Sequence, residues 1–428
     1  MRRYAANALW MMATRAAWVV SALTVGIYVT RKLGPYNFGV LNYAIALTGI
    51  FSIVATMSVE EIVIRQLIRS PGNTNRILGN FFMFRLALFL LMFTSLGITL
   101  WLMRPTSELY WLCIILSLGY AGYVVQGGVL YFQARVESKY AAIPQLLSCL
   151  VNSCIRIAAA YFDWPLLVFA MAEASNLLIY HFGCMYYYWH TVSSPRCWNW
   201  AWREVRLLLA DALPLAICGV FSLVYARTDQ LMIGYFLDLP AVGYYSLATR
   251  FTENLAIAAN LLCISFFPAV VTAAQVSLGA YQKQLHRLYF LVFWSMAGAA
   301  VVTAILCRPL VHMLFGTAYL PAVPVIKVFI WTLLGTAILY VFTQWAINER
   351  HLSMIAWSFA SGALINVFLN PLFINYIGIN GAALSSLISM PLGLVLTLIW
   401  QPIGQDHLKL ILRSILTLPS FKLGEHTS

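Results

Sequence analysis

Apolar stretches long enough to cross a lipid bilayer follow one another along almost the whole chain. A bilayer core about 30 Å thick needs about 20 apolar residues per helix, and the chain contains about twelve such stretches. Short polar segments separate them. The pattern therefore predicts an all-α polytopic membrane protein. The expected spans are 5–30, 38–64, 77–103, 109–132, 140–161, 165–189, 205–237, 241–272, 285–307, 321–347, 352–377 and 380–400.

Composition supports this fold class. Hydrophobic residues make up 62% of the 428 residues, only 9% are charged, and the mean hydropathy is +0.81. A soluble domain cannot bury that much apolar surface in one core. The first stretch contains Arg15, lacks a small-x-small cleavage site and is longer than the apolar region of a signal peptide, so we expect it to be a retained span.

Lysines and arginines between the spans predict the orientation, because cytoplasmic loops carry more of them. The outer side would have only Arg31, Lys32, Arg104 and Arg308 if both termini are cytoplasmic. The formal net charge of +12 then reflects this bias and attraction to anionic lipid, so no nucleic-acid partner is expected. The inner side would collect Arg2, Arg3, Arg65, Arg69, Arg76, Arg135, Lys139, Arg196, Arg203, Arg206, Lys283, Arg287, Arg350, Lys409, Arg413 and Lys422.

The two halves of the chain show a weak internal repeat. A shift of about 204 residues aligns Leu33, Phe38, Gly39, Val40 and Ala44 with Leu237, Val242, Gly243, Tyr244 and Ala248. A similar shift sets Gln133 and Lys139 against Gln344 and Arg350. Six spans per half is an even number, which predicts a parallel repeat about a pseudo-two-fold axis along the membrane normal, with the ligand between the halves. The expected domains are a six-helix bundle at 1–195, a cytoplasmic linker at 196–206, a second bundle at 207–403 and a cytoplasmic tail at 404–428.

Several kinds of chemistry lack their sequence signatures. The eight cysteines occur singly, without a CxxC pair, which argues against a disulfide framework or a zinc site. No glycine precedes a lysine, so the Gly-Lys step of an ATP-binding P-loop is missing, and no His-Glu step marks a zinc protease. We therefore expect that the protein binds no cofactor and is not an enzyme. Transport energy would come from an ion gradient or from substrate supply and removal.

Four short motifs, taken in their order and spacing, resemble one transporter family. They are RKLGPYNFGV at 31–40, DQLMIG at 229–234, VGYY at 242–245 and GINGAA at 378–383. Each motif alone has little specificity. Together they make nearly the whole chain similar to the polysaccharide transporter family, the Wzx-type flippases of lipid-linked oligosaccharides. The larger MOP flippase group also includes lipid II flippases and multidrug MATE exporters.

This resemblance implies a fold of two six-helix bundles facing each other across a central cavity. It also implies that the protein moves an undecaprenyl-pyrophosphate-linked oligosaccharide, such as the repeat unit of O-antigen in lipopolysaccharide, to the periplasmic leaflet of a bacterial inner membrane by alternating access. The implied partners are this lipid-linked sugar, membrane lipids, a polysaccharide polymerase and a chain-length regulator.

Charged residues inside the spans are the candidate site. A charge at the bilayer centre costs at least about 2.5–3.5 kcal/mol, so it persists mainly beside a wet cavity or a partner. A guanidinium can bond two phosphate oxygens in a planar fork, which suits pyrophosphate. The cations expected to bind substrate are Arg15, Arg85, Arg156, Arg227 and Arg250.

Span 241–272 carries four polar residues on one helical face. Ser246, Arg250, Glu253 and Asn254 follow one another at helical spacing, which predicts that they line the cavity. An ion pair between Arg250 and Glu253 that only packs the bundle is the alternative.

Three acidic residues are candidates for ion coupling. Asp229 matches the acidic position of the family's seventh-span motif and is the favoured one, although a structural salt bridge is an equal alternative. Glu253 and Glu173 are the others, and Glu173 can instead organise helices. Glu60 lies nearer a span end, where interfacial solvation explains its charge.

Two aromatic runs, 186–189 and 198–202, have the residue types that stack on sugars. Their expected place at the cytoplasmic interface favours an aromatic belt instead. The segment 196–206 is a candidate for an amphipathic helix in the plane of the membrane.

Other functions remain open. A MATE-like ion-coupled exporter of small molecules would share the fold, but it would favour acidic cavity residues, whereas the cationic bias here favours an anionic substrate. A membrane polymerase or glycosyltransferase is more distant, because the predicted outer loops are short and offer mainly Glu108, Asp163 and Asp238. A scaffold without transport would not need so many deep charges.

Overall fold

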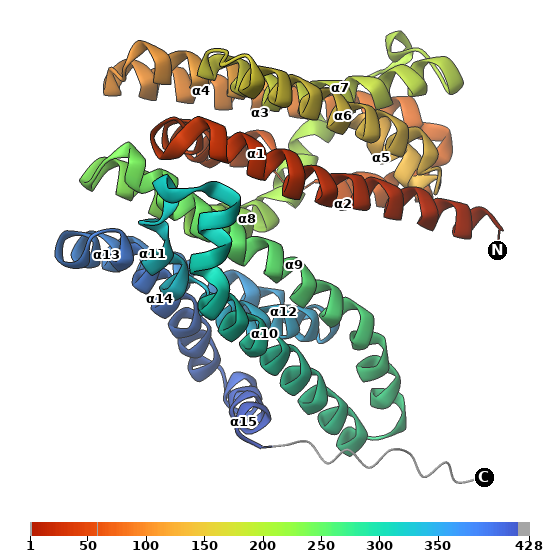
Figure 1. The fold of residues 1–428 in the computed structure, drawn as a ribbon. Coiled ribbons are helices and arrows are strands. Elements are labelled where there is room, and N and C mark those ends of the chain that lie inside the picture. Colours follow the sequence, from red (N-terminus) through yellow and green to blue (C-terminus); the bar gives the residue numbers. More distant parts are fainter. Residues whose placement is uncertain (1, 58, 418–428) are drawn as a thin grey trace. The chain divides into compact units, whose positions relative to one another are not determined.

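The computed structural model describes residues 2–57 and 59–417, without the side chains of residues 2–6, 8, 195, 211, 214–216 and 218. Every regular element in these residues is a helix (Figure 1). Internal contacts divide the chain into two compact units, Met1–Leu223 and Val224–Ser428. The boundary falls inside one long helix.

The first unit contains α1 (Arg2–Ala55), α2 (Glu60–Arg69), η1 (Pro71–Asn73), α3 (Thr74–Met103), α4 (Ser107–Gly119), η2 (Tyr120–Val125), α5 (Gly127–Ala134), α6 (Lys139–Tyr161), α7 (Leu166–Thr191) and η3 (Pro195–Cys197). Helix α8 (Trp202–Phe236) runs from the first unit into the second. The second unit continues with α9 (Leu239–Val276), α10 (Leu278–Phe315), η4 (Thr317–Tyr319), α11 (Ala322–Phe329), α12 (Thr332–Asn348), α13 (Leu352–Ile377), α14 (Ile379–Trp400) and α15 (Pro402–Leu416).

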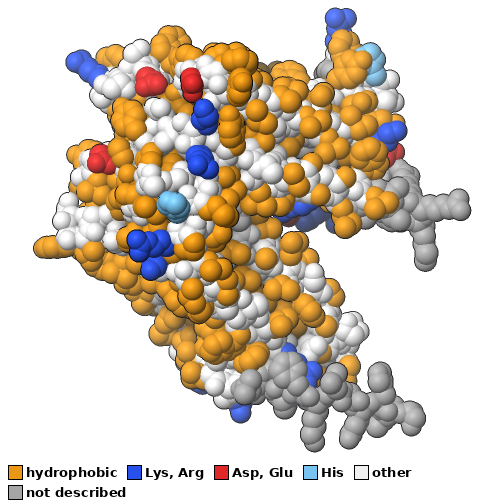
Figure 2. Space-filling view, in the orientation of Figure 1, with side chains coloured by type: hydrophobic (Ala, Val, Ile, Leu, Met, Phe, Trp, Pro, Cys, Tyr) orange, Lys and Arg blue, Asp and Glu red, His pale blue; other side chains and the backbone are white. Residues whose placement is uncertain are grey.

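The prediction of an all-α polytopic membrane protein is confirmed. Ten helical segments of the described chain are long and apolar enough to cross a membrane. The first segment covers the two predicted spans 5–30 and 38–64 together, while α8, which matches the predicted span 205–237, is not one of the ten. Hydrophobic side chains cover most of the face shown in Figure 2, as a surface in contact with lipid requires.

Helix α1 contains the predicted span 5–30 and most of the predicted span 38–64, which meet at a kink. It continues through the expected junction, where Gly34 adopts φ 69° and ψ 170° and Pro35 follows. A positive φ of this kind favours glycine, and because these angles are not helical, two helical segments meet at this residue. The RKLGPYNFGV motif therefore forms a kink.

Three predicted spans are interrupted in the structure. The span predicted at 38–64 breaks where α1 ends at Ala55 and α2 begins at Glu60. The span predicted at 109–132 is divided into α4, η2 and α5, and the span predicted at 321–347 is divided into α11 and α12. Hydropathy did not predict these breaks because an average over about 20 residues stays apolar across each of them.

The ends of the fourth predicted span in each half have the same local backbone. Val136 has φ 56°, and the Glu137 amide bonds to the Phe132 carbonyl at 2.9 Å. Arg350 has φ 61°, and the His351 amide bonds to the Ala346 carbonyl at 2.7 Å. The two helices thus end in the same type of turn, although these positions do not coincide with the pairing of Lys139 and Arg350 in the sequence repeat. The internal repeat and its pseudo-two-fold axis stay predictions.

Within the second unit, α13 and α14 pack closely through small residues. A Cβ atom on Gly393 would lie 2.5 Å from the Gly362 nitrogen, and a Cβ atom on Gly381 would lie 2.0 Å from the Phe373 carbonyl oxygen. Ser361 Oγ also donates to the Gly393 carbonyl at 3.0 Å. Small residues that let helix backbones approach are a common device for packing helices in membranes.

The predicted linker 196–206 does not form one in-plane helix. It consists of the end of η3, an irregular stretch over 198–201 and the start of α8. This stretch lies against α3, where a Cβ atom on Gly79 would meet the Asn199 carbonyl oxygen at 2.2 Å. The Ala201 amide donates to Asn80 Oδ1 at 2.8 Å. The linker is thus part of the first unit, and the division between the two units lies downstream of it.

The predicted tail 404–428 begins as helix α15, and residues 418–428 lie outside the described residues. Helix α15 packs on α10 and α14. His407 Nε2 lies 2.7 Å from Tyr289 Oη, and its ring stacks on Trp345 at a centroid distance of 3.8 Å. His286 Nδ1 lies 2.8 Å from Ser414 Oγ. Burial lowers the pKa of His407 to about 3, so its ring is neutral in the folded protein near neutral pH.

This depressed pKa predicts acid destabilisation. Between pH 6.5 and about 3 the unfolded chain binds a proton at His407 that the folded chain does not, so stability falls as pH decreases through this window. The His407→Phe variant keeps an aromatic ring on Trp345 but cannot titrate. We expect its midpoint of thermal unfolding in detergent to fall less than that of the wild type between pH 7 and pH 4.5. Equal losses in the two proteins would contradict the prediction.

Candidate functional site

Arg85 is the most deeply buried of the predicted cations. It lies on α3 and is 1% exposed. Its Nη1 donates to the Ala55 carbonyl at 2.6 Å, and its Nη2 donates to Glu60 Oε1 at 2.6 Å and to Gln126 Oε1 at 3.2 Å. The guanidinium carbon also lies 5.1 Å from the centre of the Phe81 ring.

These contacts place Arg85 at two of the helix breaks. Ala55 ends α1, Glu60 begins α2, and Gln126 lies between η2 and α5. A carbonyl freed at a helix break inside a membrane needs a partner from the protein, and Arg85 supplies it for Ala55. Glu60 is therefore the partner of a buried cation, which differs from the interfacial solvation expected for it. The predicted role of Arg85 in substrate binding stays a prediction.

Arg156 and Glu173 form an ion pair between α6 and α7. Arg156 Nη1 lies 2.9 Å from Glu173 Oε1, and both side chains are partly buried. A nearby side chain, Asn152, donates to the Ala172 carbonyl at 2.7 Å and joins the same two helices. The structure thus brings together a predicted substrate-binding cation and a predicted coupling acid.

The other predicted residues are spread over both units. Arg15 is exposed on α1 in the first unit, whereas Arg227 on α8 and Arg250 on α9 are partly buried in the second. Glu253 and Asn254 are exposed on α9. Their shared lining of one cavity stays a prediction.

Asp229 is the centre of a buried polar cluster in the second unit. It is 4% exposed on α8. Asn370 Nδ2 on α13 donates to Asp229 Oδ1 at 2.6 Å, while the hydroxyls of Tyr245 on α9 and Ser386 on α14 both donate to Oδ2. Asn366 Nδ2 donates to Ser386 Oγ at 3.2 Å. Four helices therefore meet at one carboxyl group.

Each of the three side chains that donate to Asp229 is neutral. Asn370 is fully buried, and its Oδ1 has no hydrogen-bond partner among the described residues. One carboxylate with carboxamide and hydroxyl oxygens is a donor set that suits a small hard cation or a transferable proton. No group of three or more His, Cys, Asp or Glu side chains able to hold a metal occurs in the described part of the chain.

The predicted cavity residue Ser246 lies beside this cluster. It is 1% exposed and accepts a hydrogen bond from Gln230 Nε2 at 3.3 Å. Sequence reasoning missed Tyr245, Asn366, Asn370 and Ser386 because it started from the charged residues in the spans and considered uncharged ones only on the helical face of Arg250. The two asparagines stand four residues apart in an apolar stretch, and this spacing was the signal that could have identified them.

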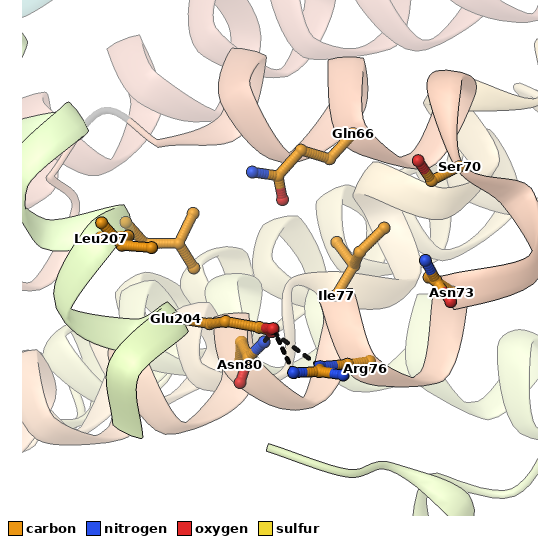
Figure 3. A pocket seen from close by; sticks show the side chains of 9 residues that line it. Gln66, Ser70, Asn73, Arg76, Ile77, Asn80, Glu204 and Leu207 are labelled. Atoms are coloured by element: carbon orange, nitrogen blue, oxygen red, sulfur yellow. Dashed lines mark hydrogen bonds and ion pairs between the residues drawn. The ribbon is translucent and has the colours of Figure 1, made fainter. Parts of the chain in front are cut away.

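A polar pocket of about 260 Å³ opens between α2, α3 and α8 in the first unit (Figure 3). Glu204 at the start of α8 accepts from Arg76 Nε at 3.0 Å and from Asn80 Nδ2. A second pocket of about 520 Å³ adjoins it and shares Asn73 and Arg76. The first is lined by Gln66, Ser70, Asn73, Arg76, Ile77, Asn80, Glu204, Leu207 and Leu208, and the second by Gly72, Asn73, Asn75, Arg76, Asn199, Trp200 and Ala201.

The Arg85 contacts predict a large loss of stability on removal of one partner. Arg85→Gln leaves the Glu60 carboxylate without its cation, which we expect to reduce the free energy of unfolding by about 3 kcal/mol. The double variant Arg85→Met/Glu60→Gln should lose less, because no buried charge is left unpaired. Lys409→Gln, at the exposed pair with Asp406, is the control and should change stability little. Denaturant unfolding in detergent measures all three, and a loss in the double variant as large as that in Arg85→Gln would contradict the prediction.

The chain matches known transporters in fold. It has a TM-score of 0.72 with an inward-facing multidrug resistance MATE family transporter of the MOP superfamily, at 13% identity, covering 92% of this chain and 96% of the other. It has a TM-score of 0.68 with the lipid II flippase MurJ in an inward closed conformation, at 15% identity, covering 95% and 90%. A MOP superfamily transporter from Pyrococcus furiosus, described as having a binding pocket of reverse polarity, gives 0.59 at 13% identity, covering 97% and 96%.

The solved structures share too little sequence with the chain to show its family, but a family model does. No curated protein matches the chain in sequence. The family model described as polysaccharide biosynthesis protein matches residues 5–274, which is more than half of the chain. The protein is therefore a multi-pass membrane protein that belongs to the polysaccharide biosynthesis protein family and has the fold of the MOP superfamily transporters.

Proposed function

We propose that this protein is a flippase that moves an undecaprenyl-pyrophosphate-linked oligosaccharide, of the O-antigen repeat-unit type, from the cytoplasmic to the periplasmic leaflet of a bacterial inner membrane. The observation that carries the proposal is membership of a polysaccharide biosynthesis family combined with a transporter fold. A polytopic membrane protein of this family contributes to polysaccharide synthesis most directly by moving a lipid-linked intermediate. The similar fold of a lipid II flippase supports the same class of substrate.

The deep arginines support an anionic headgroup. In this proposal Arg15, Arg227 and Arg250 bind the pyrophosphate, whose charge is the part of the substrate least tolerated by lipid. The polyprenyl tail stays in the bilayer while the two units alternate between inward and outward access. Arg85 and Arg156 act mainly through their carboxylate partners in the first unit. A polymerase and a chain-length regulator would receive the product outside.

Among the three acids predicted for ion coupling, Asp229 has the most suitable surroundings. Glu173 is paired with Arg156, and Glu253 is exposed. Asp229 is buried among neutral donors from α9, α13 and α14. Uptake or loss of a cation or proton there would change the charge at a point where four helices meet, and thus would favour one packing of the second unit over another.

Vesicle reconstitution tests the flippase proposal. The purified protein is placed in vesicles with a polyprenyl-pyrophosphate oligosaccharide, and exposure of the sugar to an impermeant sugar-modifying reagent is followed over time. We expect the wild type to accelerate exposure and Arg250→Gln to abolish the acceleration. Arg203→Gln, which removes the same charge at an exposed position, is the matched control and should keep activity.

Transport of an organic cation distinguishes a drug exporter from a flippase. A MATE-like exporter would release an organic cation such as ethidium from the same vesicles. Export of ethidium without exposure of the sugar would overturn the flippase proposal and favour drug export.

Gradient dependence tests the role of Asp229. In vesicles with an imposed sodium or proton gradient, we expect the wild type to expose the sugar faster than without a gradient. Asp229→Asn keeps a side chain of nearly the same shape but removes the titratable group, so its rate should be independent of the gradient. Glu173→Gln is the comparison and should retain the dependence. A gradient effect that survives in Asp229→Asn would exclude this residue from coupling.

A further inference from the structure

The two adjoining pockets in the first unit have no net charge in their lining. Among the residues that the structure describes, Arg76 and Glu204 are the only charged ones that line them. The two form an ion pair, in which Arg76 Nε donates to Glu204 Oε2 at 3.0 Å and Arg76 Nη2 contacts Glu204 Oε1. A site for phosphate would leave its cation free for the ligand. These pockets instead suit a neutral polar molecule. The pockets have volumes of about 260 and 520 Å³. Their combined volume lies within the range of roughly 300–1,000 Å³ that is usual for small-molecule sites.

The walls of the pockets are held by interactions that do not use their exposed carboxamides. Asn80 is 3% exposed, donates to Glu204 and accepts from the Ala201 amide, so it fixes the linker on α3. Gln66 and Asn199 make no side-chain hydrogen bond within the part of the chain that the structure describes. Asn73 stands at the N-cap of α3, and its side chain does not cap the helix.

Free carboxamides are suited to hydroxyl groups. Each offers one acceptor oxygen and two N–H donors, which match the combined donor and acceptor character of a sugar hydroxyl. Figure 3 shows the Gln66 and Glu204 side chains extending into the pocket from opposite sides, with Asn73 at one end. The carboxamides of Gln66, Asn73 and Asn199 thus leave their hydrogen-bonding atoms to a ligand.

Trp200 adds an aromatic wall to the larger pocket. Its side chain is 53% exposed, and the residue lies in the irregular stretch that leads into α8. The apolar C–H face of a pyranose packs on an indole ring in the same way as other apolar surfaces do. The sequence pattern favoured an aromatic belt for this residue, but the structure places it beside Asn73, Asn75 and Asn199 on the wall of a polar pocket.

We propose that these adjoining pockets form a binding subsite for a neutral sugar residue, with Trp200 as the stacking surface and Gln66, Asn73 and Asn199 as hydrogen-bonding groups. The subsite lies at the end of the first unit that the distribution of lysine and arginine assigns to the cytoplasm. A sugar carried on a membrane lipid is presented at that level before translocation. The inference rests on the proposed function for the origin of the sugar, although its binding chemistry rests on the pocket alone.

Saturation-transfer NMR with free methyl hexosides tests the subsite directly. The probes are the methyl glycosides of glucose, galactose, mannose and N-acetylglucosamine, and inorganic pyrophosphate serves as the anionic competitor. The full chain is kept in lipid nanodiscs without sugar-based detergent, because a maltoside headgroup would compete for the same site. We expect at least one hexoside to bind with a dissociation constant in the millimolar range and to resist displacement by pyrophosphate.

Matched variants locate the binding. Trp200→Ala should weaken hexoside binding by about five- to tenfold, the loss expected for one aromatic contact. Asn73→Ala should also weaken it without affecting folding, because this side chain does not cap α3. Trp202→Ala is the control, since this tryptophan is 63% exposed only two residues away but lines neither pocket. Circular dichroism and thermal unfolding verify the fold of each variant.

The outcomes separate this inference from the proposed function. Hexoside binding that is lost in Trp200→Ala and kept in Trp202→Ala supports the subsite even if the vesicle assay detects no flipping. Absence of binding to every hexoside, equal binding in the two tryptophan variants, or displacement by pyrophosphate overturns the subsite even if flipping is observed.

Discussion

The absence of water from the bilayer core is the constraint on which the rest of this structure depends. Every carbonyl freed at a helix break and every charge at membrane depth must find its partner within the protein. Arg85 meets this requirement for the end of α1 and for Glu60, and it reaches Gln126 at the break before α5. Buried polar residues therefore gather in a few clusters, and the cluster around Arg85 lies where the helices depart from regular geometry.

The two units satisfy this constraint in different ways. The first unit places carboxylates opposite its buried arginines, as Arg85 with Glu60 and Arg156 with Glu173 show. The second unit surrounds Asp229 with neutral hydroxyl and carboxamide donors. A paired ion adds little net charge to its surroundings, whereas a carboxyl group held by neutral donors can change its charge and alter the packing of four helices. Ion coupling in the second unit stays a proposal, and this difference in surroundings supports it.

The sequence predicted the helical spans well because hydropathy averaged over about 20 residues reflects the thickness of the bilayer. It did not predict the breaks before Glu60, at 120–126 or between α11 and α12, since these depend on single contacts that averaging removes. The pairing of Arg85 with Glu60 joins residues 25 positions apart on different helices, and no local pattern indicates it. The deep charges were visible in the sequence, but whether each one faces a partner or a substrate depends on tertiary packing.

Separate recognition of charge and of sugar follows from the chemistry of a lipid-linked oligosaccharide. The pyrophosphate is common to all such substrates, so arginines that bind it supply affinity without distinguishing one glycan from another. Discrimination between sugars needs donors and acceptors placed against particular hydroxyls, because an unpaired polar group in the site penalises the wrong ligand. The uncharged pocket beside Trp200 has this character, since Glu204 already neutralises Arg76. A protein with both features can hold the headgroup through its charge and select it through its neutral surface, and changes in the pocket would alter specificity while the helical framework stays the same.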